Sequence, residues 1–152
     1  MLDYGGADGK FLPTLPGKKF VFDISDVKPA DGIVRIEDAS GLGSYSYVQI
    51  AHVLEHVPHP LVLTRKAASL LKDAGYLYVE VPLEISEEET TRLLNGNRNF
   101  SIVIHEHINR YSVKSVTELF RSVGLSLVAT ETETVDLAWV EAKVIRALGR
   151  KT

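Results

Sequence analysis

The run Leu2-Asp3-Tyr4-Gly5-Gly6-Ala7-Asp8-Gly9 lies at the start of a chain of 152 residues and says most about its fold. Its first residues have the character of a strand end, and the three glycines and the alanine predict a turn. Small residues permit positive φ angles and let a ligand approach the backbone closely. Residues 10–15 have a helical start but contain Pro13, so we expect any helix there to be short or distorted, with its first amides facing an anion. A glycine-rich turn is also a common tight connection, so the run alone does not establish a binding loop.

The next strand adds a second signal. It reads Phe20-Val21-Phe22-Asp23 and ends in an acid 20 residues after Asp3. A carboxylate at the tip of the second strand can accept hydrogen bonds from both hydroxyls of a ribose. The turn and the acid together predict a nucleoside site. The alternative is that Asp23, or Asp26 beside it, only caps the following segment.

Short apolar runs rich in β-branched and aromatic residues recur at 19–23, 33–37, 45–51, 75–81, 125–130 and 139–145. Most are continuous rather than alternating, which is typical of strands covered on both faces, as in a parallel sheet. Helical spacing predicts a helix over 60–73 and another from Ser112 or Val113 to Val123. Ser112 can cap the second helix, and Gly124 can take a left-handed conformation after its end.

The order of strands and helices predicts one α/β domain over residues 1–152, with a Rossmann-like, mostly parallel sheet. The last two strands are only about eight residues apart, too close for a helical crossover, so we expect an antiparallel C-terminal pair. The N-terminal half is expected to be truncated, with a very short first strand. Nine residues separate Asp23 from Ile33 and seven separate Glu37 from Tyr45. A parallel crossover usually takes about 10–12 residues, so the helices of that half should be missing or reduced to loops.

The composition narrows the class of function. A net charge of −3 gives no electrostatic reason to expect nucleic acid or an anionic membrane as partner. The absence of cysteine excludes disulfides and thiolate metal sites. No apolar stretch approaches the roughly 20 residues of a membrane helix, and residues 1–5 lack the features of a signal peptide. We expect a cytoplasmic protein, and the sequence does not indicate its oligomeric state.

Several segments, in order, resemble the class I S-adenosylmethionine-dependent methyltransferases. Asp3-x-Gly5-x-Ala7-x-Gly9 resembles the first motif of that family, with Ala7 in place of its middle glycine. Asp23-Ile24-Ser25 and Glu37-Asp38-Ala39 look like the acidic segments that follow the second and third strands of that family. Residues 50–57 look like the segment after its fourth strand, and residues 70–82 look like the approach to its fifth strand. Residues 107–112 resemble a feature of a subgroup that modifies small molecules.

This resemblance covers nearly the whole chain and implies S-adenosylmethionine as cofactor and a small molecule as substrate. The residues that it places around the cofactor are Asp3, Gly5, Ala7, Gly9, Asp23, Asp38 and His52. A sulfonium already activates the methyl group, so the protein must align a nucleophile and remove its proton. His56 and His107 are the candidate catalytic bases, with His105 as a third. The alternative for each is a structural histidine, and the alternative for the chain is a degenerate, non-catalytic domain that keeps the fold.

The run His52-Val53-Leu54-Glu55-His56 also matches H-x-x-E-H, the signature of inverted zinc proteases. That third interpretation, a metal-dependent hydrolase, requires a helix from His52 and a third ligand from a distant acid, and His105 and His107 could complete a metal site in principle. His52 follows a strand-like run directly, and Pro58 limits any helix. We therefore expect no metal site, and place these residues in the loop after the fourth strand, where doubly wound folds bind ligands.

Overall fold

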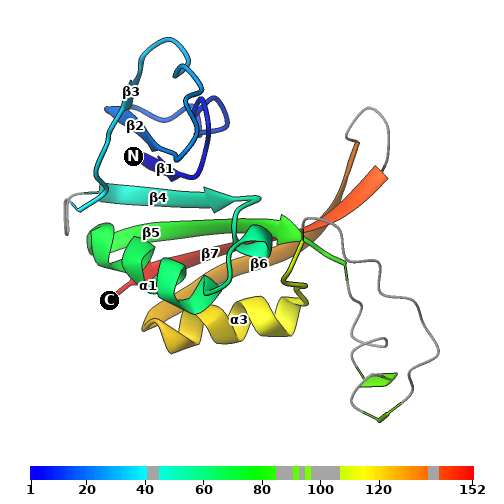
Figure 1. Ribbon diagram of the computed structural model, residues 1–152. Helices are drawn as coiled ribbons and strands as arrows, with labels where there is room; N and C mark the ends of the chain where they lie inside the picture. Colours follow the sequence, from blue (N-terminus) through cyan, green and yellow to red (C-terminus); the bar gives the residue numbers. More distant parts are fainter. Residues whose placement is uncertain (41–44, 85–90, 93–94, 97–106, 137–140) are drawn as a thin grey trace.

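The computed structural model describes residues 1–40, 45–84, 91–92, 95–96, 107–136 and 141–152 (Figure 1). The strands are β1 (Leu2–Tyr4), β2 (Lys19–Phe22), β3 (Ile33–Arg35), β4 (Tyr45–Ala51), β5 (Leu71–Pro82), β6 (Leu125–Asp136) and β7 (Glu141–Lys151). The helices are α1 (Pro60–Leu70) and α3 (Val113–Ser122), and the 3-10 turn η1 covers Leu54–His56. Among the described residues, no helix, including α1 and α3, has the length and apolar character that crossing a membrane requires.

The strands form one sheet in the order β3-β2-β1-β4-β5-β7-β6. The first five pair in parallel, and β7 runs antiparallel to both β5 and β6. This confirms the predicted mostly parallel sheet with an antiparallel C-terminal pair. The chain reverses its direction of travel across the sheet between β1 and β4, and α/β sheets bind ligands outside the strand ends at such a point.

The N-terminal half of the sheet is connected by loops, as the short spacings predicted. Within the described residues, none of 5–18, 24–32 and 36–40 is helical. No helix forms over residues 10–15, where any helix was expected to be short or distorted. Gly9 has a φ of 74° and its carbonyl accepts only a turn-closing bond from the Leu12 amide, so the chain turns instead of winding further. Figure 1 shows β1, β2 and β3 joined by these loops.

The two described helices pack on the same face of the sheet and contact each other. Along β5 the side chains alternate: Leu77, Val79 and Val81 are fully buried on the helical face, whereas Tyr78 and Glu80 between them are half-buried on the opposite face. The continuous apolar runs indicated strands that are covered on both faces, but α1 and α3 cover only one face of the sheet. An alternating strand in a parallel pair is possible here because one face carries polar side chains.

The predicted helices form, with one change of boundary. Ser112 caps α3, since its hydroxyl accepts from the Ser115 amide in a capping box, and Gly124 follows with a φ of 75°. The helix expected over 60–73 ends at Leu70. Leu71 is extended, fully buried and paired with Tyr45, so β5 begins four residues earlier than its pattern indicated.

Candidate functional site

The glycine-rich turn is shaped around the side chain of Asp3. A Cβ atom added at Gly6 would lie 2.0 Å from Cγ of Asp3, so only glycine leaves room for this carboxyl group. Gly5 and Ala7 have φ angles of 82° and 50°, and the Gly5 amide donates to the carbonyl of Phe22. The sequence analysis did not single out Gly6, although its position three residues after a strand acid was the available signal.

Asp3 is a buried acid that has no cationic partner in the described structure. It is only 1% exposed, and its Oδ1 accepts a long hydrogen bond of 3.4 Å from Nε2 of Gln49. Its Oδ2 has no hydrogen-bond donor among the described residues. Burial raises the pKa of Asp3 from 3.8 to about 6, partly offset by the Gln49 bond. An ionised group in such a place favours a ligand that brings positive charge.

The carboxyl group of Asp3 lies in the wall of a cavity of about 710 Å³, within the usual size of small-ligand sites. The cavity extends from the turn across the face of β4 and β5 opposite the helices. At its mouth Phe11 is 73% exposed. The lining residues are Asp3, Gly5, Gly6, Ala7, Phe11, Pro13, Tyr47, Gln49, Ala51, His52, Tyr78, Glu80, Val135 and Arg146.

His52 contributes a positive charge to this cavity. The backbone turns sharply at His52, with a φ of 54°, and its Nε2 lies 3.0 Å from Oε1 of Glu80. The neighbouring carboxylates of Glu55 and Glu80 raise the pKa of His52 to about 9. The same contact with His52, helped by Tyr78 and Arg146, lowers the pKa of Glu80 to about 2. Both groups are therefore charged at neutral pH, and neither is poised to exchange a proton.

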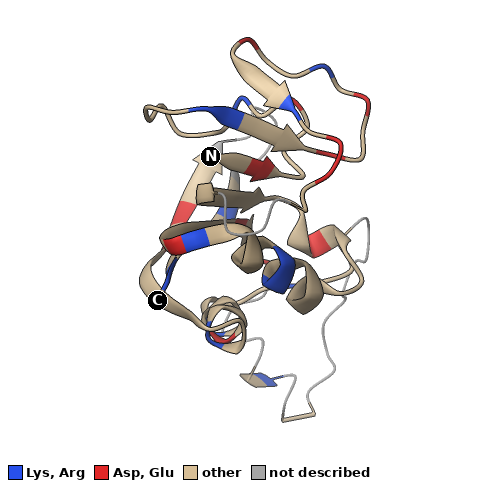
Figure 2. Cartoon of the chain, turned by 90° about the vertical axis from the view of Figure 1, so that its left-hand side faces the viewer, with Lys and Arg blue, Asp and Glu red and all other residues tan. Residues whose placement is uncertain are grey.

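Lys and Arg residues are interspersed with Asp and Glu residues along the described chain, as Figure 2 shows. Arg146 illustrates the local pairing, because its guanidinium contacts Glu80, Glu131 and Glu133. The cavity wall thus holds individual ionisable groups such as Asp3 and His52 within a surface that has no broad field of one sign.

The glycine-rich turn and Asp23 are in direct contact. The Ala7 amide donates to Oδ2 of Asp23 over 2.8 Å, and the Ser25 amide donates to its Oδ1 over 2.7 Å. Partial burial opposes ionisation of Asp23, but these bonds and the charge of Arg35 outweigh it and lower the pKa of Asp23. Both oxygens thus already hold backbone amides, and Asp23 is not in the cavity wall.

Two other residues expected at the cofactor also lie outside the cavity wall. Gly9 packs inward, since a Cβ atom there would lie 3.0 Å from the Ile33 side chain. Asp38 is exposed and accepts a hydrogen bond from the Ser40 hydroxyl. Of the seven expected cofactor residues, Asp3, Gly5, Ala7 and His52 line the cavity.

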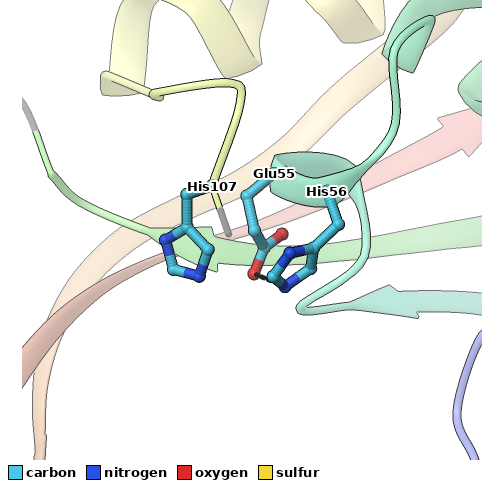
Figure 3. Close-up of side chains that lie close together, drawn as sticks. All are labelled: Glu55, His56 and His107. Atoms are coloured by element: carbon cyan, nitrogen blue, oxygen red, sulfur yellow. Dashed lines mark ion pairs between the residues drawn. The ribbon is translucent and has the colours of Figure 1, made fainter. Parts of the chain in front are cut away.

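The two candidate bases, His56 and His107, lie together beside Glu55 (Figure 3). Their ring centroids are 4.8 Å apart in an edge-to-face arrangement. Figure 3 shows the Glu55 carboxylate close to the His56 ring, with the His107 side chain beside them. His105 lies outside the described residues. Glu55 and His107 come from segments 52 residues apart, so the residue types were the available signal for this pair.

The zinc-protease arrangement does not form. Only Leu54–His56 is helical, as a 3-10 turn, and the left-handed backbone of His52 breaks any longer helix. His52 contacts Glu80 and Glu55, so it does not share a helical face with His56. The H-x-x-E-H pattern is therefore not an inverted zinc-protease helix in this chain.

A set of hydrogen bonds that the sequence analysis missed fixes the His107 segment to η1. The Glu55 carbonyl accepts from the amides of Ile108 and Asn109. The Asn109 side chain donates to the carbonyls of Leu54 and Val57, over 3.0 and 2.6 Å. The Tyr111 hydroxyl also donates to the Leu54 carbonyl, over 3.0 Å. These bonds hold the loop after β4 and the segment before α3 in one rigid unit.

The chain is similar to known methyltransferases, as the matched family shows. The profile of a methyltransferase domain family matches residues 1–130. No curated protein matches the chain in sequence.

Solved structures that share the fold include a SAM-dependent methyltransferase of Thermotoga maritima, with 16% identity over 99% of this chain and 81% of that one and a TM-score of 0.69. Another, from Methanosarcina mazei, has 14% identity over 99% and 91% of the two chains and a TM-score of 0.68. A third is 1,6-didemethyltoxoflavin-N1-methyltransferase of Burkholderia thailandensis, solved with its substrate and S-adenosylhomocysteine. It has 12% identity over 99% and 70% of the chains and a TM-score of 0.70.

Proposed function

The chain belongs to the methyltransferase domain family, and we propose that it transfers the methyl group of S-adenosylmethionine to a small molecule. The observation that carries the proposal is the carboxyl group of Asp3, which is buried, lacks a donor at Oδ2 and faces a cavity. S-adenosylmethionine has an ammonium and a sulfonium group, and positive charge is what this carboxylate lacks. The fit is therefore between a cationic ligand and an unpartnered buried anion.

The amino-acid end of the cofactor is a zwitterion, and the same cavity wall offers a charge of each sign. Asp3 suits an ammonium group, and the cationic His52 suits a carboxylate. Gly5 and Ala7 in the turn bring the backbone to the wall without bulky side chains. We keep Asp23 as the candidate for the ribose, because a carboxylate oxygen that accepts one amide still has a lone pair. Gly9 supports the turn, and a role for Asp38 around the cofactor stays a prediction.

A small-molecule acceptor is supported by the cavity itself. Its volume of about 710 Å³ suits a cofactor and a compact acceptor better than a macromolecular surface. The neighbour from Burkholderia thailandensis acts on a small heterocycle, according to its description. His56 and His107 are not among the residues that line the cavity, but they remain the groups proposed to act on the acceptor, either by taking its proton or through a bound metal ion.

The test is calorimetric titration of the whole chain with S-adenosylmethionine and S-adenosylhomocysteine. We expect saturable binding with a dissociation constant below about 1 mM, in the range of typical substrates. Methyl transfer is then followed with radiolabelled cofactor against small molecules that carry nitrogen or oxygen nucleophiles. Absence of heat for either ligand at millimolar concentration would contradict the proposal.

A second candidate is a non-catalytic domain that keeps the fold. It is favoured by one observation, the use of both Asp23 oxygens by the amides of Ala7 and Ser25. This candidate predicts no binding of either ligand, so the same titration separates the two.

A further inference from the structure

We propose that Glu55, His56 and His107 bind a divalent transition metal ion of the Zn²⁺ type. Each side chain offers one ligand atom, and these three atoms lie within 4.8 Å of one another. Figure 3 shows the three side chains close together, with the carboxylate beside the two imidazoles. Two histidines and one carboxylate are a common set for catalytic metal ions, which keep a coordination position open.

Glu55 is the strongest sign of a missing ligand. Its side chain is only 1% exposed, and neither carboxylate oxygen accepts a hydrogen bond from the described residues. The nearest basic nitrogens to Oε1 are Nδ1 of His52 at 3.4 Å and Nε2 of His56 at 3.9 Å. A buried carboxylate that accepts no hydrogen bond is strongly disfavoured, and a bound cation would offset that penalty.

His107 is oriented as metal-binding histidines are. Its Nδ1 lies 3.0 Å from Oε1 of Glu84, which leaves Nε2 to face the other ligands. A carboxylate behind a histidine ligand fixes the ring and makes its other nitrogen a better donor to a metal. Such an outer partner is not required if His107 only fills space, so the Glu84 contact is independent support for the site.

The backbone around the site is rigid enough to hold an ion. The carbonyl of Glu55 accepts the amides of Ile108 and Asn109, and the Asn109 side chain bridges the carbonyls of Leu54 and Val57. The ligands from the two segments therefore stay at a fixed separation. Metal sites need this kind of support, because a loose pair of segments would separate on losing the ion.

The ligand atoms need only a small closure. With bonds of about 2.1 Å, two ligand atoms of a tetrahedral Zn²⁺ site lie about 3.4 Å apart, so the largest separation must fall by about 1.4 Å. His56 is partly exposed, with 38% of its side chain accessible, and a ring rotation can supply this movement. Imidazole ligands favour Zn²⁺, Co²⁺ and Ni²⁺ over Mg²⁺, which prefers oxygen ligands.

The experiment measures metal binding alone, without the methyl donor, so its result does not depend on the proposed function. The whole chain is stripped with a chelator and titrated with ZnCl₂, CoCl₂ and MgCl₂ by calorimetry, and Co²⁺ is also followed by its visible absorption. We expect that each chain binds one Zn²⁺ ion and that Mg²⁺ binds much more weakly. The visible absorption of bound Co²⁺ should be that of an ion with a low coordination number.

Four variants locate the ion. His56→Gln, His107→Gln and Glu55→Gln should each abolish the Co²⁺ spectrum, and Glu84→Gln should weaken Zn²⁺ binding by about 10–100-fold. The matched control is His59→Gln, since His59 is an exposed histidine three residues from His56 and lies outside the cluster. Circular dichroism checks the fold of each variant. If Glu55→Gln unfolds, His56→Gln still tests the site, because His56 is exposed and its replacement should leave the fold intact.

Three outcomes would overturn the proposal. The first is absence of Zn²⁺ and Co²⁺ binding by the folded parent chain. The second is binding of Zn²⁺ by both His56→Gln and His107→Gln with the stoichiometry and affinity of the parent chain. The third is an equal loss in His59→Gln, which would mean that surface histidines bind the ion without a built site.

Discussion

Replacement of Asp3 by asparagine should stabilise the unliganded protein and weaken its binding of S-adenosylmethionine. The pKa of Asp3 is raised from 3.8 to about 6, so the folded state holds the proton more tightly than the unfolded chain. The carboxyl group therefore lowers the free energy of unfolding as the pH rises from about 4 to about 6, by about 3 kcal/mol in total. Above that range Asp3→Asn lacks this penalty.

At pH 8 we expect Asp3→Asn to be more stable than the parent by up to about 3 kcal/mol, or roughly 6–12 °C in Tm for a chain of this length. At pH 4 the difference should nearly vanish, because Asp3 is then protonated in both states. The gain requires that the asparagine amide keep the Gln49 contact. Thermal and urea unfolding between pH 4 and pH 8 measure both values.

Binding should change in the opposite direction. Loss of a charge-assisted contact to the cofactor ammonium costs about 1.5–3 kcal/mol, which weakens binding roughly 10–100-fold at pH 8. In the parent the affinity should fall by up to about tenfold per pH unit below pH 6, whereas Asp3→Asn should show no such dependence. Calorimetry across the pH range gives both slopes.

The control is Asp26→Asn, which removes an exposed negative charge from the same half of the sheet. It should change neither Tm nor affinity by more than a small amount. The reasoning is refuted if Asp3→Asn binds the cofactor as the parent does. It is also refuted if the variant is destabilised at pH 8, since Asp3 would then be a structural group.

Three further substitutions test the turn and the helical layer. Gly6→Ala should displace the Asp3 carboxyl group, cost about 1–3 kcal/mol of stability and weaken cofactor binding at least as much as Asp3→Asn does; an alanine variant with normal affinity would mean that the turn yields easily. Ser112→Ala should lower the free energy of unfolding by about 1 kcal/mol through loss of the α3 cap, while Co²⁺ absorption is unchanged. Phe120→Ala should cost about 3–5 kcal/mol in urea unfolding, because the ring is fully buried against Gly149; a loss below 1 kcal/mol would show that α3 repacks.

Much of the fold could be predicted because its signals are local. The spacing of Asp23 and Ile33 excluded a crossover helix, and the short connection between the last strands required an antiparallel pair. Ser112 and Gly124 marked the ends of α3 by side-chain and backbone chemistry alone. The end of α1 was not predicted, because the helical pattern continues past Leu70 and only the pairing of Leu71 with Tyr45 stops it.

The site was less predictable, because its determinants are long-range. The motif indicated Asp3 and the turn, but only the fold reveals that Gly6 makes room for the carboxyl group and that Asp23 is bound by the Ala7 amide. Glu55 and His107 become neighbours through the hydrogen bonds of Asn109, which no spacing rule predicts. The role of His52 likewise depends on Glu80 from a different strand.

The two faces of the sheet have different roles, one in stability and the other at the cavity. Leu77 and Val79 under the helices carry the cohesion of the domain, whereas Tyr78 and Glu80, their sequence neighbours, face the cavity with little packed upon them. Substitutions on the cavity side can thus alter what the protein recognises while the opposite side keeps it folded. A library randomised at Tyr47, Tyr78 and Arg146 should consequently yield many soluble members, and this side of β4, β5 and β7 offers the natural starting point for redirecting acceptor choice.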